Sequence, residues 1–242
     1  MIKKDSIYKG DNSNDLPFSF NEEVAEVFED MIDRSVPGYA SSLRLIKIFT
    51  NKYFRENSNC YDLGCSLGAA TERLLKATEG KEAKIIAIDN SKAMIDSCNR
   101  RYADHIKSGK VEFIKQDITD TKISNSSIVV INFVLQFLSS AERTSLLERV
   151  YEGMIPGGRL ILSEKIHFDS RFRTEAMSEL HHQFKAENGY TEMEISRKRD
   201  ALEGVLLTDL GTLHFQRLES IGFKKVRKVM TNLNFMTLVA GK

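Results

Sequence analysis

Short apolar segments alternate with amphipathic segments between residues 57 and 165, and this alternation limits the possible folds more than any other feature. The apolar segments have the length of strands, and the segments between them repeat apolar residues at helical spacing. Strands buried on both faces need helices on both sides. The pattern therefore predicts an α/β fold, a doubly wound and mostly parallel sheet. Predicted strands cover 60–63, 84–88, 111–115, 128–133 and 159–163, and predicted helices cover 69–77, 93–106 and 141–154.

The segments on either side of this core differ from it. Residues 1–17 are polar, and we expect them to form a loose arm. A helix is predicted after Asn21, which suits an N-cap, and a second helix follows the break at 36–39. The last strands are expected in a closing hairpin, which makes the sheet seven-stranded. We expect one domain, made of an N-terminal arm with helices, a core, a helical insert and a closing helix with hairpin, at 1–56, 57–165, 166–210 and 211–242.

Composition excludes several classes of protein. The 242 residues carry 35 Lys and Arg against 34 Asp and Glu, a formal net charge of +1, so direct binding to nucleic acid is not expected. Three cysteines without paired spacing argue against disulfides, and we expect no metal site. No apolar run is long enough to span a bilayer, and the first residues do not resemble a signal peptide. We therefore expect a cytoplasmic protein with no membrane partner.

A glycine-containing turn follows the first predicted strand of the core. In Asp62-Leu63-Gly64-Cys65-Ser66-Leu67-Gly68, glycine lets the backbone approach a ligand, and we expect amides at the helix start to face outward. Ser66 replaces the middle glycine of the acidic-x-Gly-x-Gly-x-Gly pattern, and Asp62 suits a ligand with a positive amino group better than a pyrophosphate. The alternative is a tight turn that binds nothing.

Polar residues at the tips of the next three predicted strands extend this candidate site. Asp89 ends the second strand, where a carboxylate can accept hydrogen bonds from both hydroxyls of a ribose, or can cap the next helix. Asp117 and Ile118 follow the third strand and offer an acceptor for an exocyclic amine and an apolar side chain for a base. Asn132 ends the fourth strand. Taken singly, Asp117 and Asn132 fit ordinary turns, but together the four features predict a nucleoside-type site.

One arginine in the helical insert lies in an apolar pattern. Arg199 is four residues after Ile195 and three before Leu202, so it is predicted on their apolar stripe, whereas Arg197 and Lys198 are expected in solvent. A guanidinium on an apolar face needs an anionic partner. Three readings remain open, which are a ligand carboxylate, an internal ion pair, and an arginine that extends outward to water.

Two further features of the insert concern its surface. His181 and His182 point about 100° apart on a helix, which makes them a poor metal chelate, and we expect both at the helix surface or in an interface. The exposed apolar and aromatic side chains of the insert are the expected interface with another chain. They are Phe172, Met177, Phe184 and Tyr190.

The motifs of the core resemble the Rossmann-like, class I S-adenosylmethionine-dependent methyltransferases over about residues 57–165. Beyond this core, from about residue 20 to the C-terminus, the chain resembles the carboxy-S-adenosyl-L-methionine synthase family. The segments that carry the second resemblance are 34–39, 61–71, 86–91, 135–138 and 181–209.

The second resemblance implies an activity and a set of contacts. Members of this family are understood to convert S-adenosyl-L-methionine and prephenate to carboxy-S-adenosyl-L-methionine and phenylpyruvate. The product supports carboxymethylation of a wobble uridine by a partner tRNA carboxymethyltransferase, and a homodimer is implied. Arg199 would be the catalytic residue and would hold the new carboxylate. The other implied ligand contacts are Tyr39, Gly64, Cys65, Ser66, Asp89, Asn90, Asp117, Ile118 and Asn132.

Two other functions stay open from the residues. An ordinary S-adenosylmethionine-dependent methyltransferase acting on a small molecule or tRNA would use the glycine turn and Asp89 equally well. A module without catalytic activity could bind the nucleoside for a partner protein. The sequence contains no evident protein base, and the resemblance implies that a group departing from prephenate accepts the methyl proton.

Overall fold

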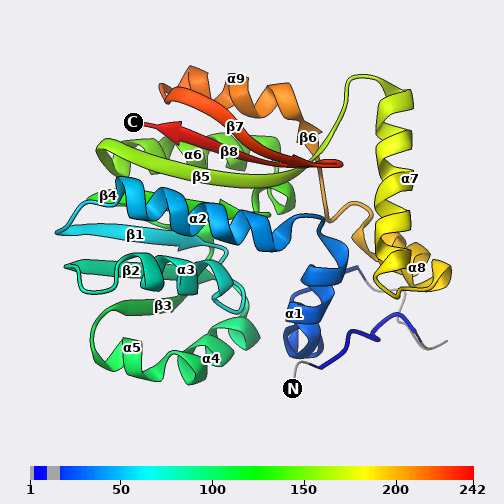
Figure 1. Ribbon diagram of the computed structural model, residues 1–242, viewed down its shortest axis with the longest axis horizontal. Coiled ribbons are helices and arrows are strands. Elements are labelled where there is room, and N and C mark those ends of the chain that lie inside the picture. The colour runs from blue at the N-terminus through cyan, green and yellow to red at the C-terminus, as the bar shows by residue number, and fades with distance from the viewer. Residues whose placement is uncertain (1–2, 10–16) are drawn as a thin grey trace.

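The computed structural model describes residues 3–9 and 17–242, and a mostly parallel sheet forms its centre (Figure 1). Along its main path the sheet has the strand order β3-β2-β1-β4-β5-β8-β7, and β8 is antiparallel to both of its neighbours. The predicted seven-stranded, doubly wound sheet is confirmed, and a two-residue strand, β6 (Asp209–Leu210), pairs with β5 off this path. The other strands are β1 (Ser58–Leu63), β2 (Ala83–Asp89), β3 (Val111–Lys115), β4 (Ser126–Asn132), β5 (Met154–His167), β7 (Lys224–Asn232) and β8 (Phe235–Gly241).

Helices cover both faces of the sheet, as its apolar strands require. On one face, Ile46 of α2 (Tyr39–Tyr53), Leu74 of α3 (Ala69–Ala77) and Cys98 of α4 (Lys92–Arg101) belong to one buried cluster. On the other face, α6 (Ser140–Gly153) and α9 (Gly211–Ile221) contribute Leu146 and Leu218 to a second cluster. The core therefore lies in two layers, one on each side of the sheet.

Three helices stand beyond the carboxyl ends of the parallel strands (Figure 1). They are α1 (Glu22–Ser35), α7 (Arg171–Glu187) and α8 (Glu192–Leu202). The predicted cap is confirmed, because the side chain of Asn21 accepts a hydrogen bond from the Val24 amide at 2.9 Å. A reciprocal capping box between Thr191 and Glu194 begins α8. These helices border the sheet edge where ligands of open α/β folds bind.

The first described residues are not a loose arm. Asp5 is only 2% exposed, and its carbonyl accepts a hydrogen bond from the Arg34 guanidinium at 2.8 Å. Tyr8 is also buried, and its carbonyl accepts from Arg197 at 3.3 Å. The prediction is therefore wrong for 3–9, and the other residues of the predicted arm up to 16 lie outside the described part of the chain.

Two boundaries in the core also differ from prediction. The helix expected over 93–106 is divided at Tyr102 into α4 and α5 (Ala103–Lys107). The strand predicted over 159–163 begins earlier, because residues 156–158 already lie inside β5. There the Gly157 amide donates to the Lys242 carbonyl at 2.9 Å. Pairing with the C-terminus thus holds the Pro-Gly-Gly segment within the strand, although Gly157 has a φ of 83°. Within the described ranges, no helix has the length and apolar character needed to cross a membrane.

Candidate active site

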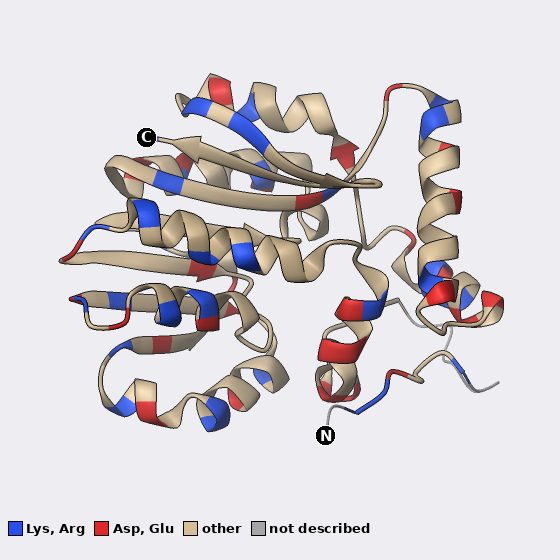
Figure 2. Cartoon of the chain, in the orientation of Figure 1, with Lys and Arg blue, Asp and Glu red and all other residues tan. Residues whose placement is uncertain are grey.

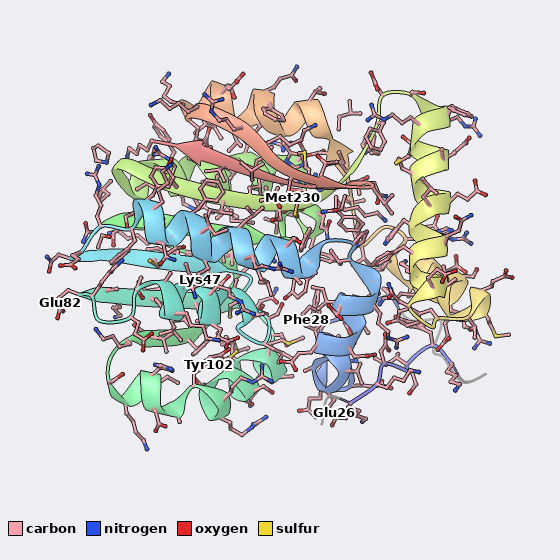
Figure 3. The ribbon with its side chains drawn as sticks, in the orientation of Figure 1. Glu26, Phe28, Lys47, Glu82, Tyr102 and Met230 are labelled. Atoms are coloured by element: carbon pink, nitrogen blue, oxygen red, sulfur yellow. The ribbon has the colours of Figure 1, made fainter. Side chains whose placement is uncertain are left out.

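A cavity of about 1070 Å³ lies at the carboxyl ends of β1 to β4 and extends beneath α1, α7 and α8. Phe28, which is labelled in Figure 3, comes from α1 and lines it. Its volume is at the upper end of the range for small-molecule sites, which leaves room for more than one small ligand. All the predicted contacts except Arg199 line this cavity, namely Tyr39, Gly64, Cys65, Ser66, Asp89, Asn90, Asp117, Ile118 and Asn132.

The glycine turn binds the end of β2 through its own backbone. Gly64 has a φ of 78°, and a Cβ there would lie 2.5 Å from Val134 Cγ2. The amides of Gly64 and Cys65 both donate to the Ile88 carbonyl, at 2.8 and 2.9 Å. The Ser66 amide donates to Asp89 Oδ2 at 2.9 Å. These three amides therefore point back into the protein, and this part of the turn does not form a cradle for a pyrophosphate. The amides at the start of α3, which are expected to face outward, are not among them.

Asp89 fixes this turn and does not cap α4. Besides the Ser66 amide, it accepts the Ser91 amide through Oδ1 at 2.9 Å. Ser91 is the N-cap, because its hydroxyl accepts from the Met94 amide at 3.3 Å. Burial raises the pKa of Asp89, while the two amide hydrogen bonds oppose that shift. Each carboxylate oxygen has a second acceptor direction, which remains available to a ribose hydroxyl.

Asp117 and Asn132 differ in how far the protein already satisfies them. Asp117 is exposed and accepts from the amide and hydroxyl of Thr119, at 2.8 and 2.7 Å, so it caps the short helix η1 (Ile118–Asp120). Asn132 Oδ1 is buried and has no hydrogen-bond partner among the described residues. A buried acceptor without a donor is costly, so Asn132 suits a ligand that carries N–H or O–H groups.

Asp62 supplies negative charge beneath the glycine turn. It is 1% exposed, and the Thr71 hydroxyl donates to it at 2.6 Å. Burial raises its pKa to about 6, and the bonds from Thr71 oppose that shift. Together, Asp62, Asp89 and the Asn132 oxygen give the strand tips an acceptor-rich lining. Such a lining fits a ligand that carries hydroxyl groups and positive charge.

Lys198 and Arg199 of α8 have the opposite environments to those predicted. The Arg199 side chain is 62% exposed, lies 3.1 Å from Asp200 Oδ1, and does not line the cavity. Lys198, expected in solvent, is 6% exposed and lines the cavity. Its ammonium donates to the Ser35 hydroxyl at 3.1 Å. The expected placement of Arg199 on the buried stripe is therefore wrong.

Helix geometry explains the exchange. Lys198 is three residues after Ile195 and Arg199 is four residues after it. At about 100° of rotation per residue, these two positions lie on opposite sides of the apolar stripe. Glu194 is buried in its capping box, so the buried face turns toward its side of Ile195, which is also the side of Lys198. Spacing from Ile195 and Leu202 alone does not distinguish the two cations.

His181 and Tyr190 are also internal. His181 is 4% exposed, its Nε2 lies 2.7 Å from the Ser35 carbonyl, and its ring contacts Phe235 edge-on at 5.0 Å. Burial, followed by nearby lysines, lowers its pKa far below the usual value, so the ring is neutral. The Tyr190 hydroxyl donates to the Asp5 carboxylate. The surface placement predicted for both residues is wrong. Across residues 3–9 and 17–242, no group of three metal-ligand side chains could hold an ion.

Two further cavity residues, Lys165 and Lys185, were not predicted. Lys185 is four residues after His181, so the two side chains lie on the same face of α7. A prediction that His181 is buried would therefore have predicted a buried Lys185 as well. Lys165 lies at the end of β5, where a lysine after an apolar strand gives no distinct signal. Both positions depend on how the insert packs over the sheet.

Comparisons with known proteins identify the core. Residues 61–158 match a family model described as "Methyltransferase domain". An O-methyltransferase family protein from Burkholderia thailandensis has a similar fold, with a TM-score of 0.64 at 14% identity over 95% of this chain and 65% of that chain. Human N-acetylserotonin methyltransferase in complex with SAM gives a TM-score of 0.61 at 14% identity over 91% of this chain and 55% of that one. At this identity the likeness concerns the fold alone.

Relatives of much higher identity cover 93% or more of the chain. The carboxy-S-adenosyl-L-methionine synthase of Shewanella halifaxensis is 46% identical over 225 residues, which are 93% of both chains. That of Salmonella paratyphi C is 43% identical over 242 residues, 100% of this chain and 98% of the relative. The similarity includes the insert and the N-terminal helices as well as the core. The chain is therefore an enzyme that belongs to the carboxy-S-adenosyl-L-methionine synthase family.

Proposed function

We propose that this enzyme converts S-adenosyl-L-methionine and prephenate to carboxy-S-adenosyl-L-methionine and phenylpyruvate. The ring carboxylate of prephenate leaves as carbon dioxide, its ring hydroxyl leaves as hydroxide, and the ring becomes aromatic. The hydroxide takes a proton from the sulfonium methyl group, which gives water and a sulfonium ylide. The ylide carbon then attacks carbon dioxide and forms the new carboxylate. The products are carboxy-S-adenosyl-L-methionine, phenylpyruvate and water.

One observation carries this proposal, namely that a single cavity has an acceptor-rich side at the strand tips and a lysine-rich side under the insert. S-adenosylmethionine is a cation at sulfur and fits the first side, whereas prephenate is a dianion and fits the second. Because the reaction supplies its own base and its own carbon dioxide, the protein has to hold the two substrates together and keep water away from them. The size of the cavity, about 1070 Å³, and the neutral His181 are consistent with that task.

Residues at the strand tips have separate roles in this proposal. Asp89 and Asn90 hold the ribose, Asp117 and Ile118 the adenine, and Asn132 the methionine portion, while Gly64, Cys65 and Ser66 form the surface beneath the amino-acid end. Tyr39 lines the same end. The role of Arg199 in this proposal rests only on the position that it occupies in the family. Since it lies at the surface of its own chain, holding the new carboxylate would require a movement of α8 or a second copy of the chain.

The biological setting is part of the same proposal. The product would serve a tRNA carboxymethyltransferase that modifies the wobble uridine, and the synthase itself, in the cytoplasm, would not bind tRNA. The net charge of +1 supports that division of labour. We also propose a homodimer formed through the insert.

Mass analysis of the sulfonium product tests the reaction. The purified enzyme is incubated with S-adenosylmethionine and prephenate whose ring carboxylate carries an isotopic label. We expect the sulfonium compound to gain one labelled carbon dioxide unit and unlabelled phenylpyruvate to form in equal amount. Transfer of an unmodified methyl group to another molecule would favour an ordinary methyltransferase. Ligand binding without turnover of prephenate would favour a binding module.

A further inference from the structure

Three lysines from three different elements meet on one side of the cavity. Lys165 comes from β5, Lys185 from α7 and Lys198 from α8. Lys185 is 7% exposed and Lys198 is 6% exposed. All three line the same cavity, and burial, followed by the charges of Lys165 and Lys198, lowers the pKa of Lys185. Buried like charges are costly in free energy unless an anion lies among them.

Within residues 3–9 and 17–242, partners are found for one of these charges. The Lys198 ammonium lies 3.8 Å from Asp5 Oδ2 and donates to the Ser35 hydroxyl at 3.1 Å. For Lys165 and Lys185, no hydrogen bond or ion pair joins the ammonium to any group in the described part of the chain. The Lys165 ammonium lies over the Phe235 ring, 6.0 Å from its centroid. Two lysine amino groups without a partner among the described residues thus face the cavity.

A row of aromatic rings connects these lysines to the strand tips. The ring of Tyr39 lies 6.3 Å from that of Phe133, which lies 5.9 Å from that of Phe235. Lys165 pairs with Phe235 across β5 and β8. Because Phe133 directly follows Asn132, the lysines lie next to the end of the cavity assigned to the methionine portion and its sulfonium. A ligand held by them would lie beside the reacting methyl group.

We infer that Lys165 and Lys185, assisted by Lys198, form a subsite for a small organic dianion with two carboxylates, the second substrate of the reaction. This inference rests on the proposed function, in which that substrate is prephenate. Two uncompensated ammonium groups match its two carboxylates, and lysine binds such groups as a point charge. The rings of Phe133 and Phe235 offer apolar surface to its carbon skeleton. Carboxylates could also come from the carboxylated product, and the experiment distinguishes these sources.

Binding without chemistry tests the subsite. S-adenosylhomocysteine lacks the methyl group, so the enzyme saturated with it can bind prephenate without the transfer reaction, and titration calorimetry gives the Kd. Lys165→Met and Lys185→Met remove charge while keeping side-chain length. Each should raise the Kd of prephenate about tenfold or more, because a charge-assisted hydrogen bond is lost. The Kd of S-adenosylhomocysteine should stay within about twofold, since the lysines do not bind it.

Lys47→Met is the matched control, because Lys47 is exposed on α2 outside the cavity (Figure 3). It should change neither Kd. Phenylpyruvate, with one carboxylate, should bind the unaltered enzyme more weakly than prephenate and lose less affinity in the variants.

Three results would overturn the inference. They are an unchanged Kd of prephenate in both lysine variants, equal weakening of prephenate and S-adenosylhomocysteine, and weakening of carboxy-S-adenosylmethionine with unchanged prephenate. The last would assign the lysines to the product carboxylate. The proposed function fails separately, when the unaltered enzyme transfers no labelled carbon dioxide. Lysine-dependent binding of prephenate would then still support the subsite.

Discussion

Asp89 combines a structural and a ligand-binding position in one carboxylate. Its two oxygens accept from the amides of Ser66 and Ser91, which joins the glycine turn to the start of α4. The same carboxylate is 9% exposed and lines the cavity. A side chain in this position affects the shape of the site and its hydrogen bonds at once, so a substitution should be judged against both effects.

Asp89→Asn should weaken every ligand that carries the ribose. The amide keeps the size of the side chain but provides one acceptor oxygen instead of two, so a buried amide or a ribose hydroxyl loses its partner. We expect the Kd of S-adenosylhomocysteine, measured by calorimetry, to rise about tenfold or more. Asp96→Asn on α4, whose carboxylate pairs with Lys92 outside the cavity, is the control. Equal affinity in both variants would show that Asp89 does not contact the ligand.

Lys185 should make dianion binding depend on pH. Burial, and then the charges of Lys165 and Lys198, lower its pKa from 10.5 to about 7. Neutral His181 and His182 lie on the same helix, and Asp5 lies with Lys198. Since a dianion binds the charged ammonium, the Kd of prephenate should rise as the pH rises from about 6 to 9. The slope should be smaller in Lys185→Met, and an equal slope would assign the titration to another group.

The same shift has the opposite effect on the empty protein. Between about pH 7 and 10.5, the unfolded chain binds a proton at Lys185 that the folded chain does not. The contribution of Lys185 to the free energy of unfolding therefore increases as the pH rises through this window. Denaturant unfolding of the ligand-free enzyme and of Lys185→Met, compared across that window, checks this sign.

The sequence predicted the acceptors of the site better than its cations. Asp89 and Asn132 each end a strand and Asp117 follows one, and strand order alone brings such residues to one edge of the sheet. Lys185 and Lys198 lie on helices of the insert, whose rotation depends on contacts with α1 and with residues 3–9. The spacing from Ile195 and Leu202 allowed either Lys198 or Arg199 to be buried. The burial of Glu194 in its capping box and the contact of Lys198 with Asp5 decide between them.

At the scale of elements, the glycine turn and the short helix η2 (Leu135–Phe137) close the cavity from two sides. Glu164 holds η2, because its carboxylate accepts from the amides of Val134, Leu135 and Gln136 at 3.2, 2.8 and 3.1 Å. Val134 in turn packs where a Cβ on Gly64 would lie. The two elements are therefore coupled by a direct contact.

Gly64→Ala should show this coupling when it is compared with Gly80→Ala. Both glycines have positive φ, 78° and 75°, but nothing lies within 4 Å of a Cβ at Gly80. Gly80→Ala should therefore lower the free energy of unfolding by only about 1–2 kcal/mol. Gly64→Ala should lower it further, because Val134 must move, and should also weaken S-adenosylhomocysteine binding. Equal effects of the two substitutions in denaturant unfolding would contradict the coupling.

Strands and helices of the core followed the predicted pattern because burial on both sides of the sheet fixes their composition. The helix over 69–77 and the strand over 111–115 have the predicted bounds. The division of the next helix at Tyr102 has a tertiary cause, since the Tyr102 hydroxyl donates to the Gly68 carbonyl at 3.0 Å. The extension of β5 through 154–158 likewise depends on pairing with the C-terminus.

In the whole molecule, the second side of the ligand cavity is formed by helices that lie outside the sheet core. The acidic helix α1 (Figure 2) lines the cavity together with α7 and α8, whereas the sheet supplies the strand tips. In this arrangement, the insert faces the cavity on one side and solvent on the other. Its solvent side carries large apolar side chains, which are the remaining candidates for contact with another molecule.

The insert is therefore the surface at which the proposed homodimer can be tested. Four of the five large, exposed hydrophobic side chains found among the described residues belong to it or to its connection to β6, and Phe172 on α7 is 81% exposed. Phe172→Asp places a charge in an apolar contact, so sedimentation should show a shift from dimer to monomer. Ile48→Asp is the matched control, because Ile48 is 56% exposed on α2, away from the insert. A dimer that survives Phe172→Asp but dissociates in Ile48→Asp would move the interface to α2, and a monomeric unaltered enzyme would exclude the proposed homodimer.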